Sequence, residues 1–363
     1  MILSDALFDN QYRDRSVLLT GHTGFKGSWL ALWLQEMGAM VHGIALDPCT
    51  MPNHWDRLAL DMSDRRVDIR FADAVLAELS EAQPEIVFHL AAQPLVRRSY
   101  RDPVGTWASN VMGTVNLLEA CRKTPSVRAI IVVTSDKCYQ NKELSSGYRE
   151  NDALGGHDPY SASKAGAEIV AASYRSSFFG AQGGPLMATA RAGNVIGGGD
   201  WSEDRLIPDL VRALANRTEL EVRSPHATRP WQHVLESLSG YLLLGQKLLQ
   251  GQNAFAQAWN FGPPPEGNRC VADLLDGLVL HWPELRWHVA DIIQPHEANL
   301  LYLDSSKARR ELGWLPVWTF EQTLAVTADW YRQFYASQQL YTRSQLADYV
   351  LAARNAGLEW AAS

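Results

Sequence analysis

Short, continuously apolar runs alternate with longer stretches of helical periodicity over the first two-thirds of the chain. The apolar runs predict strands over residues 16–20, 39–46, 86–90, 129–134 and 186–192. The stretches between them predict helices over residues 24–36, 106–122 and 161–178. A strand that is apolar throughout is buried on both faces, so this alternation predicts an α/β fold with a doubly wound parallel sheet.

The pattern changes after Gly197. The triplet Gly197-Gly198-Gly199 and Pro208 interrupt the regular alternation, and Trp, Pro and Arg become frequent. The segment Trp259-Asn260-Phe261-Gly262 looks like a strand that leaves the sheet and ends in the loop Pro263-Pro264-Pro265. We therefore predict a sheet domain over 1–196 and 231–262, and a smaller C-terminal α/β substrate-binding domain over 197–230 and 263–363.

Composition narrows the functional classes. The 363 residues are 46% hydrophobic and 20% charged, as in globular proteins, and the net charge of −7 disfavours nucleic acid as a partner. No apolar run approaches the ~20 residues of a membrane span. The N-terminus has no signal-peptide pattern, and the four cysteines are scattered, so we expect a cytoplasmic protein without disulfides or a metal site.

A glycine-rich turn joins the first predicted strand to the first predicted helix. It reads Thr20-Gly21-His22-Thr23-Gly24-Phe25-Lys26-Gly27. Glycines at this spacing permit a tight turn and a close approach of the backbone to a pyrophosphate at a helix N-terminus. The sequence therefore predicts an NAD-binding Rossmann domain, with Gly21 and residues 23–27 in contact with the cofactor. The alternative is an ordinary glycine-rich turn.

The next two loops add candidate cofactor contacts. Asp47 follows the second strand, where a carboxylate can accept a hydrogen bond from the adenosine ribose and favour NAD over NADP. The alternative is that Asp47 is the first residue of an ordinary turn. Asp68 and Ile69 are predicted to touch the adenine, although an exposed loop acid fits Asp68 nearly as well. The small residues of the segment Leu90-Ala91-Ala92 would let the cofactor pass close to the backbone after the fourth strand.

Candidate catalytic side chains lie in two later segments. Thr134-Ser135-Asp136-Lys137 follows a predicted strand, and Tyr160-x-x-x-Lys164 opens a predicted helix. The phenol and the amine are one helical turn apart, so the lysine charge can lower the phenol pKa from its ordinary ~10. The alternatives are a turn or N-cap for the first segment, and a helix start with a solvated lysine for the second.

Together these motifs resemble the extended short-chain dehydrogenase/reductase family, and within it the sugar-nucleotide 4,6-dehydratases. The resemblance covers nearly the whole chain and also rests on His89-Leu90-Ala91-Ala92-Gln93, Arg191-Ala192-Gly193-Asn194, Gly198-Gly199-Asp200-Trp201 and Arg229-Pro230-Trp231-Gln232-His233. It implies that NAD is a retained catalyst, and that Thr134, Tyr160 and Lys164 also contact it.

The resemblance further implies the reaction. The dTDP-glucose relatives carry Thr-Asp-Glu where this chain has Ser135-Asp136-Lys137, which favours the CDP branch. A hydro-lyase of that branch converts CDP-D-glucose to CDP-4-dehydro-6-deoxy-D-glucose and water. Ser135 would bond the C4 oxygen and Asp136 would protonate the departing C6 hydroxyl. Lys137 would be the C5 base, or a charged group that stabilises the enolate. A second departure, Val67 where the family has glycine, weakens the adenine contact predicted for Asp68.

Substrate contacts and assembly follow from the same resemblance. The predicted substrate-binding residues are Gln93, Asn194, Arg205, Arg229 and His233. The two arginines would hold the diphosphate, although any single arginine is as often a surface charge. In related enzymes the helices that correspond to 106–122 and 161–178 pair with their copies, which implies a homodimer or a higher homo-oligomer. A role in the synthesis of O-antigen or other surface polysaccharide is also implied.

Four other functions remain open at the level of sequence. A nucleotide-sugar 4-epimerase would share the cofactor site and Tyr160, but would not need Asp136 and Lys137. A 4,6-dehydratase for another nucleotide sugar would carry out the same reaction on a different substrate. A simple alcohol dehydrogenase would release NADH, and an NAD-sensing regulator would have no need for Tyr160 and Lys164 in register.

Overall fold

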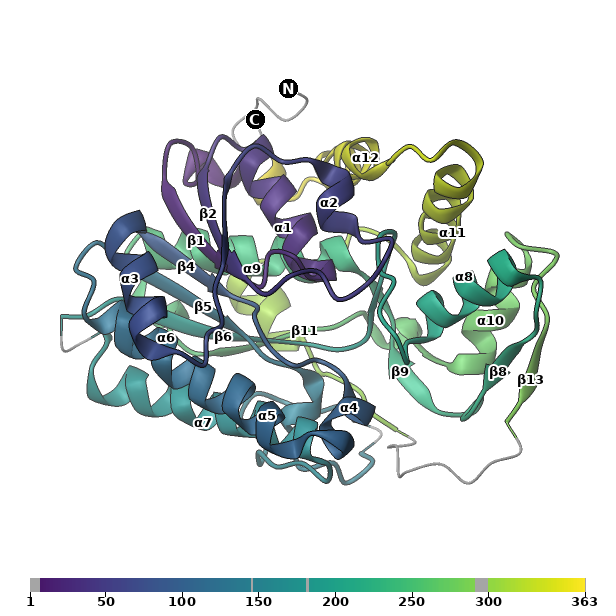
Figure 1. Ribbon diagram of the computed structural model, residues 1–363, viewed down its shortest axis with the longest axis horizontal. Helices are drawn as coiled ribbons and strands as arrows, with labels where there is room; N and C mark the ends of the chain where they lie inside the picture. The colour runs from purple at the N-terminus through teal and green to yellow at the C-terminus, as the bar shows by residue number, and fades with distance from the viewer. Residues whose placement is uncertain (1–6, 145, 181–182, 291–299, 363) are drawn as a thin grey trace.

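A seven-stranded parallel sheet forms the centre of the protein (Figure 1). The computed structural model describes residues 7–144, 146–180, 183–290 and 300–362. The strands are β1 Ser16–Thr20, β2 Met40–Ala45, β3 Ser63–Arg66, β4 Ile86–His89, β5 Ala129–Val133, β6 Leu186–Ala192 and β11 Ala258–Phe261. Their order is β11-β6-β5-β4-β1-β2-β3, with every neighbouring pair parallel.

The order of the strands reverses between β1 and β4. The chain runs outward from β1 through β2 to β3, and then outward on the other side from β4 to β5 and β6. Loops that follow β1 and β4 therefore diverge, and this is the place where doubly wound sheets bind their ligands. The arrangement confirms the predicted Rossmann fold.

Helices cover both faces of the sheet. On one face lie α1 (Phe25–Glu36) and α9 (Val234–Leu249), and their side chains form a large core with β1, β5 and β6. On the other lie α3 (Ala72–Ala82), α6 (Gly113–Arg122) and α7 (Pro159–Ser177), which enclose a second core. Nearly every residue of α9 is buried because α9 is also covered by the end of the chain.

The predicted strands agree with the structure to within one or two residues, but several elements were not assigned, among them β3 and α9. Strand β3 is polar and lies at the edge of the sheet, so it lacks the apolar run that identified the other strands. Helix α3 was not assigned. The helix predicted from residue 106 begins earlier, with α5 (Pro103–Trp107), because Asp102 caps it by accepting from Gly105 N. It continues through a π-helical turn, Ala108–Met112, into α6.

The smaller part of the protein lies beside the main sheet (Figure 1). It contains α8 (Leu206–Asn216) and α10 (Val271–Val279). Three two-stranded sheets pair β7 (Val195–Ile196) with β10 (Gln232–His233), β8 (Leu220–Val222) with β13 (Trp287–Val289), and β9 (Thr228–Pro230) with β12 (Asn268–Cys270). Short helices α2 (His54–Leu58) and α4 (Val96–Arg101) complete the loops of the larger part.

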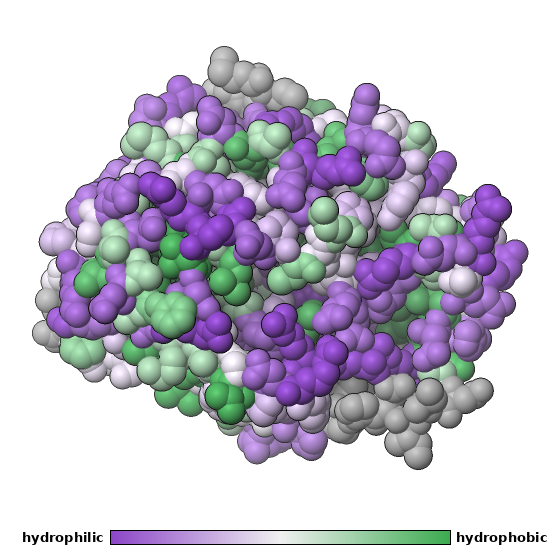
Figure 2. Space-filling model, in the orientation of Figure 1, coloured by the Kyte–Doolittle hydropathy of each residue, from purple (hydrophilic) through white to green (hydrophobic). Residues whose placement is uncertain are grey.

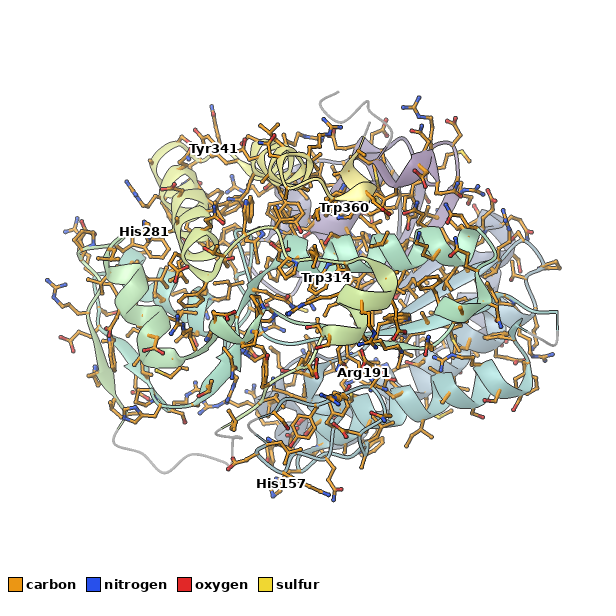
Figure 3. The ribbon with its side chains drawn as sticks, turned by 180° about the vertical axis from the view of Figure 1, so that it is seen from behind. His157, Arg191, His281, Trp314, Tyr341 and Trp360 are labelled. Atoms are coloured by element: carbon orange, nitrogen blue, oxygen red, sulfur yellow. The ribbon has the colours of Figure 1, made fainter. Side chains whose placement is uncertain are left out.

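The last helices, α11 (Phe320–Ser337) and α12 (Thr342–Asn355), return to the larger part. Trp330 lies directly over Gly198, where a Cβ atom would stand 2.0 Å from the indole. Trp360 stacks on Phe8 with ring centroids 5.0 Å apart, so the two ends of the described chain meet (Figure 3). Trp360 also packs against Trp33 of α1, with ring centroids 5.8 Å apart, so the predicted substrate-binding domain contacts the predicted sheet domain. The division into two domains stays a prediction. None of the described helices is long and apolar enough to cross a membrane.

Glu236 joins α9 to this returning segment. Its carboxylate accepts from the backbone N–H groups of Val317 (2.9 Å) and Trp318 (2.8 Å), and from the Tyr349 hydroxyl (2.8 Å). Burial raises the pKa of Glu236 to about 7, so the folded chain binds a proton that the unfolded chain releases.

This raised pKa has a consequence for stability. The free energy of unfolding should fall as the pH rises from about 4.5 to about 7 and then level off, because over that range only the folded state keeps the proton. Urea unfolding at a series of pH values measures this slope. In Glu236→Gln the slope should be flatter, and an unchanged slope would assign it to other groups.

Candidate active site

The glycine turn has the shape that close approach to a ligand requires. Gly21 has φ of 75°, and a Cβ atom there would lie 2.7 Å from Ala91 N. A Cβ atom on Gly27 would lie 2.1 Å from Gly21 O, so neither position tolerates a side chain. Gly24 is the N-cap of α1 and offers no side-chain acceptor to the first N–H groups of the helix. These donors and the helix dipole make an anion site at this turn.

The carboxyl ends of β1 and β4 are fastened together beside this turn. Thr20 Oγ1 accepts from Leu90 N (3.1 Å) and from Ala91 N (3.0 Å). The predicted segment Leu90-Ala91-Ala92 therefore lies against the glycine turn, with its small side chains half-buried. This position agrees with the close passage of a cofactor along the backbone.

The two acids predicted to contact the adenosine part of the cofactor, Asp47 and Asp68, have ion-pair partners within the protein. Asp47 is largely exposed after β2 and accepts from Arg66 Nε at 2.7 Å. Asp68 pairs with Arg70 at 2.5 Å, and the Arg70 guanidinium lowers the pKa of Asp68. The Ile69 side chain lies in the second core, so only its backbone is available to a ligand. The ribose and adenine contacts stay predictions.

Ser135, Asp136 and Lys137 form a compact group at the carboxyl end of β5. Ser135 caps a short 3-10 turn; its Oγ donates to Asp136 Oδ1 (2.9 Å) and accepts from Lys137 N (3.2 Å). Lys137 Nζ lies 3.5 Å from the same Oδ1. The other oxygen, Asp136 Oδ2, is buried and has no hydrogen-bond partner among the described residues. Gly193 lies beside it and allows the Pro230 ring to pack closely, since a Cβ atom on Gly193 would lie 2.4 Å from Pro230 Cγ and 3.3 Å from Asp136 Oδ2.

Tyr160 and Lys164 face this group from the first turns of α7. A capping box between Asp158 and Ser161 fixes the start of the helix one residue before Tyr160. Burial raises the pKa of Tyr160 to about 12, and a hydrogen bond with Ser135 opposes that shift. Burial lowers the pKa of Lys164 to about 8, and its Nζ donates to Val133 O at 3.4 Å. Burial therefore dominates the pKa of Tyr160, which must lose its proton before it can act as a base.

Beneath these residues lies a buried ion pair that sequence reasoning missed. Glu168 Oε2 accepts from Arg191 Nη2 (2.7 Å) and from Thr189 Oγ1 (2.8 Å), while Thr134 Oγ1 donates to Oε1. Arg191 also donates to the Tyr139 hydroxyl at 2.8 Å. Glu168 follows Lys164 by one helical turn, and that spacing was a signal available in the sequence. Because Thr134 points to Glu168, its side chain is already bonded within the protein.

Two of the predicted substrate contacts serve the protein itself. The Gln93 amide donates to Leu95 O and Thr106 Oγ1 and accepts from Leu95 N, so it fixes the loop after β4. His233 has no exposed surface; it caps α9 by accepting from Leu235 N, and burial lowers its pKa to about 3. Trp29 and Trp318 also pack against its ring, with ring centroids 6.0 Å and 4.8 Å away, and the substrate contact of His233 stays a prediction.

The substrate contacts of Asn194, Arg205 and Arg229 also stay predictions. Asn194 follows β6, and its Oδ1 is buried with no partner in the described part of the chain. Arg205 precedes α8, is about one-third exposed and lies 3.6 Å from an Asp200 carboxylate oxygen. Arg229 is 4% exposed in β9, and its Nη1 donates to Thr228 O at 2.9 Å. Arg205 acts electrostatically on Tyr160, which places its charge near the reaction site.

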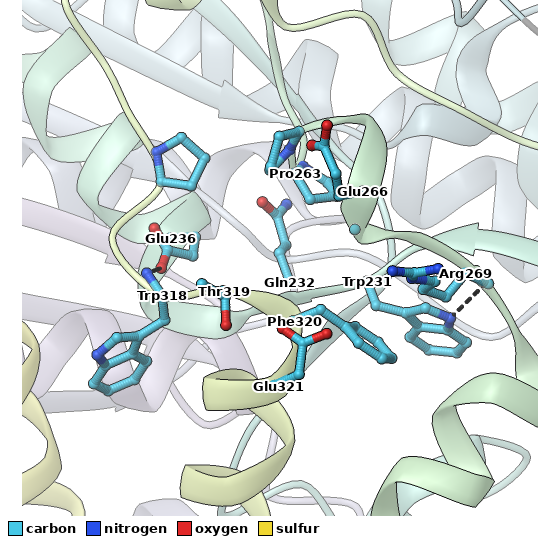
Figure 4. Close-up of a pocket in the computed structure, with 13 residues that line it drawn as sticks. Trp231, Gln232, Glu236, Pro263, Glu266, Arg269, Trp318, Thr319, Phe320 and Glu321 are labelled. Atoms are coloured by element: carbon cyan, nitrogen blue, oxygen red, sulfur yellow. Dashed lines mark hydrogen bonds between the residues drawn. The ribbon is translucent and has the colours of Figure 1, made fainter.

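A separate cavity of about 290 Å³ lies between α9, the proline-rich loop and the start of α11 (Figure 4). Its walls include Trp231, Gln232, Glu266, Trp318 and Phe320. None of the predicted catalytic residues lines it, so this cavity is not the site assembled above.

Comparison with known proteins gives the same assignment as the motifs. Residues 17–262 match the model of the NAD dependent epimerase/dehydratase family. CDP-glucose 4,6-dehydratase of Salmonella typhimurium is 46% identical over 352 residues, which covers 94% of this chain and 98% of the relative. A dTDP-glucose 4,6-dehydratase of Xanthomonas campestris is 27% identical and covers 86% of this chain and 92% of its own.

Solved structures agree in fold. A dTDP-glucose 4,6-dehydratase from Streptomyces venezuelae, solved with NAD and TYD bound, is 26% identical with a TM-score of 0.73, over 88% of this chain and 98% of that one. An epimerase from Methanothermobacter thermautotrophicus superposes with a TM-score of 0.80 at 22% identity, over 93% and 98% of the two chains, and supports the fold alone. The match over most of the chain, together with the 46% identical relative, shows that this protein belongs to the NAD dependent epimerase/dehydratase family.

Proposed function

We propose that the chain is an NAD-dependent CDP-D-glucose 4,6-dehydratase, a hydro-lyase that forms CDP-4-dehydro-6-deoxy-D-glucose and water. One observation carries this proposal. Asp136 and Lys137, an acid and an amine suited to elimination, stand beside Ser135 and Tyr160, which are suited to oxidation of an alcohol. The 46% identity to a CDP-glucose 4,6-dehydratase supports the choice of nucleotide.

The glycine turn fits the cofactor. The start of α1 is uncapped, Gly21 and Gly27 leave the backbone open, and the loop after β4 passes alongside. These residues would hold the pyrophosphate, and Lys164 would reach the nicotinamide ribose. NAD supplies a hydride acceptor that returns the same hydride later in the reaction.

Each catalytic side chain has one task at one atom. Tyr160 takes the proton of the C4 hydroxyl while the C4 hydride leaves, and Ser135 donates a hydrogen bond to the C4 oxygen. The resulting ketone acidifies the proton on C5. Lys137 either removes that proton or stabilises the enolate with its charge, and Asp136 gives a proton to the C6 hydroxyl as it leaves as water. Return of the hydride to C6 and of a proton to C5 would complete the product and leave the cofactor oxidised.

The substrate would be held on the other side of this group. Arg205 and Arg229 supply positive charge for the diphosphate, and the unpartnered Asn194 Oδ1 accepts from a sugar hydroxyl. The unpartnered Asp136 Oδ2 is the oxygen that would meet the C6 hydroxyl.

Assembly and cellular setting belong to the same proposal. Large apolar residues are exposed on the outer helices of one face, among them Val104, Trp107 and Met112 near α5 and α6, and Ile169 and Phe178 on and after α7. Apolar side chains gather over this region in Figure 2. They support a homodimer through these helices. A cytoplasmic enzyme of surface-polysaccharide synthesis fits this proposal.

CDP-D-glucose deuterated at C4 tests the proposed reaction. The product should have lost one water and should keep the deuterium, now on C6, as mass spectrometry and proton NMR can establish. Inversion at C4 without a change in mass would identify an epimerase. Conversion of another nucleotide sugar in preference to CDP-glucose would overturn the choice of nucleotide.

Lys137→Met separates elimination from oxidation. The variant should lose exchange of the C5 proton in D2O while it still forms transient NADH, because only the amine at C5 has been removed. Absorbance at 340 nm and NMR measure the two steps. Loss of both steps would mean that Lys137 also positions the sugar. Exchange at the wild-type rate would assign the base to another group.

A further inference from the structure

Lys26 is a lysine in an unfavourable place for a cation. It is the second residue of α1, where the positive end of the helix dipole disfavours an ammonium group. Its Nζ donates to the Tyr241 hydroxyl at 3.3 Å and lies 5.7 Å from the centre of that ring. No carboxylate pairs with it in the part of the chain that the structure describes.

The ammonium is close enough to the catalytic residues to interact with them electrostatically. The charged groups that act on it are Arg205, Lys164, Asp136 and Lys137. Tyr241, its hydrogen-bond partner, in turn interacts with Tyr160. Three of the four charges around Lys26 are positive, so this part of the site repels any further cation.

The two halves of NAD differ in how they respond to such a field. The pyrophosphate belongs at the start of α1, and its charge is the same in NAD+ and NADH. The nicotinamide must reach Tyr160 and the sugar, which puts it near the catalytic groups that act on the Lys26 ammonium. Its ring carries a positive charge in NAD+ and none in NADH.

We propose that the Lys26 ammonium borders the nicotinamide and favours the reduced cofactor over the oxidised one, which makes bound NAD+ a stronger hydride acceptor. This inference rests on the proposed function and extends it. Its effect is confined to the oxidation step: the C4–H bond breaks, two electrons pass to the ring as hydride, and the hydroxyl proton goes to Tyr160. Lys26 is a positioning charge that makes or breaks no bond.

The test is the ratio of two dissociation constants, for NAD+ and for NADH, measured by isothermal titration on the whole chain freed of nucleotide. Lys26→Met should reduce the preference for NADH by about tenfold or more, since a unit charge acts strongly over a few ångströms in a partly buried site. For a two-electron couple, tenfold corresponds to about 30 mV. Lys123→Met, which removes an exposed lysine at the end of α6, should leave the ratio unchanged.

The possible results separate the explanations. Equal weakening of both nucleotides, with the ratio unchanged, would mean that Lys26 contacts only the pyrophosphate, and the inference would fail while the proposed function stands. Failure of the wild-type chain to bind either NAD+ or NADH would contradict both this inference and the proposed function. If Lys26→Met does not fold, Lys26→Gln tests the same charge with a polar side chain.

The pH gives a second readout. Burial lowers the pKa of Lys26 to about 7, so the preference of the wild type for NADH should decline as the pH rises through that value. Lys164, whose pKa burial lowers to about 8, titrates in an overlapping range. The ratio of the two dissociation constants should therefore change less with pH in Lys26→Met than in the wild type. An identical pH dependence in the two proteins would contradict the inference.

Discussion

Tyr160→Phe should lower the turnover rate by about 10²–10⁴-fold, because it removes the group that takes the C4 hydroxyl proton. Transient NADH should no longer form, since oxidation is the first step. In the wild type the oxidation step should accelerate as the pH rises above neutral, because burial raises the pKa of Tyr160 to about 12 and the phenolate is scarce at pH 7. Stopped-flow absorbance at 340 nm measures both effects.

The control for this variant is Tyr100→Phe. Tyr100 is 42% exposed, lies outside the catalytic group and should leave the rate unchanged. If Tyr160→Phe kept a tenth or more of the wild-type rate of NADH formation, another base would have to act at C4.

Glu168→Ala should lower the free energy of unfolding by about 3–5 kcal/mol, because it leaves the Arg191 guanidinium buried without its counter-charge. Burial alone would raise the pKa of Glu168, but Arg191 and three hydrogen bonds hold that pKa below its ordinary value. The carboxylate is therefore charged in the folded state. Urea unfolding of the nucleotide-free chain measures the loss.

Two further variants define what this measurement means. Glu168→Ala combined with Arg191→Met should be more stable than Glu168→Ala alone, since the unpaired charge is removed as well. Glu203→Ala breaks an exposed ion pair with Arg101 at 3.4 Å and should cost less than about 1 kcal/mol. A loss for Glu168→Ala no larger than that of Glu203→Ala would show that the buried pair contributes little.

The sheet could be predicted because its inner strands are apolar on both faces. The segment 186–192 coincides with β6, and the turn before α1 could be recognised from glycine spacing alone. Strand β3, with the sequence Ser-Asp-Arg-Arg, has no apolar run. As an edge strand it is held in the sheet by backbone hydrogen bonds to β2. Its side chains stay in water.

For the site, sequence could name residues but not their surroundings. The pairing of Tyr160 with Lys164 follows from helical spacing, whereas the burial that raises one pKa and lowers the other depends on elements far away in the chain. His233 shows the same limit: its motif is typical of a ligand contact, but the two tryptophans that pack against its ring come from distant segments. The position of Lys26 beside Tyr241, 215 residues later, also depends on the tertiary fold.

The stacking of Phe8 on Trp360 bears on how the chain folds during synthesis. Tyr12 donates to Leu242 O at 2.5 Å, so the first described residues take partners from later parts and the end of the chain. A ribosome makes these partners long after Phe8 has emerged. The early strands can pair as they appear, but the nascent chain must keep an aromatic surface exposed until its last helices arrive, and a chaperone that binds aromatic segments would find its target there.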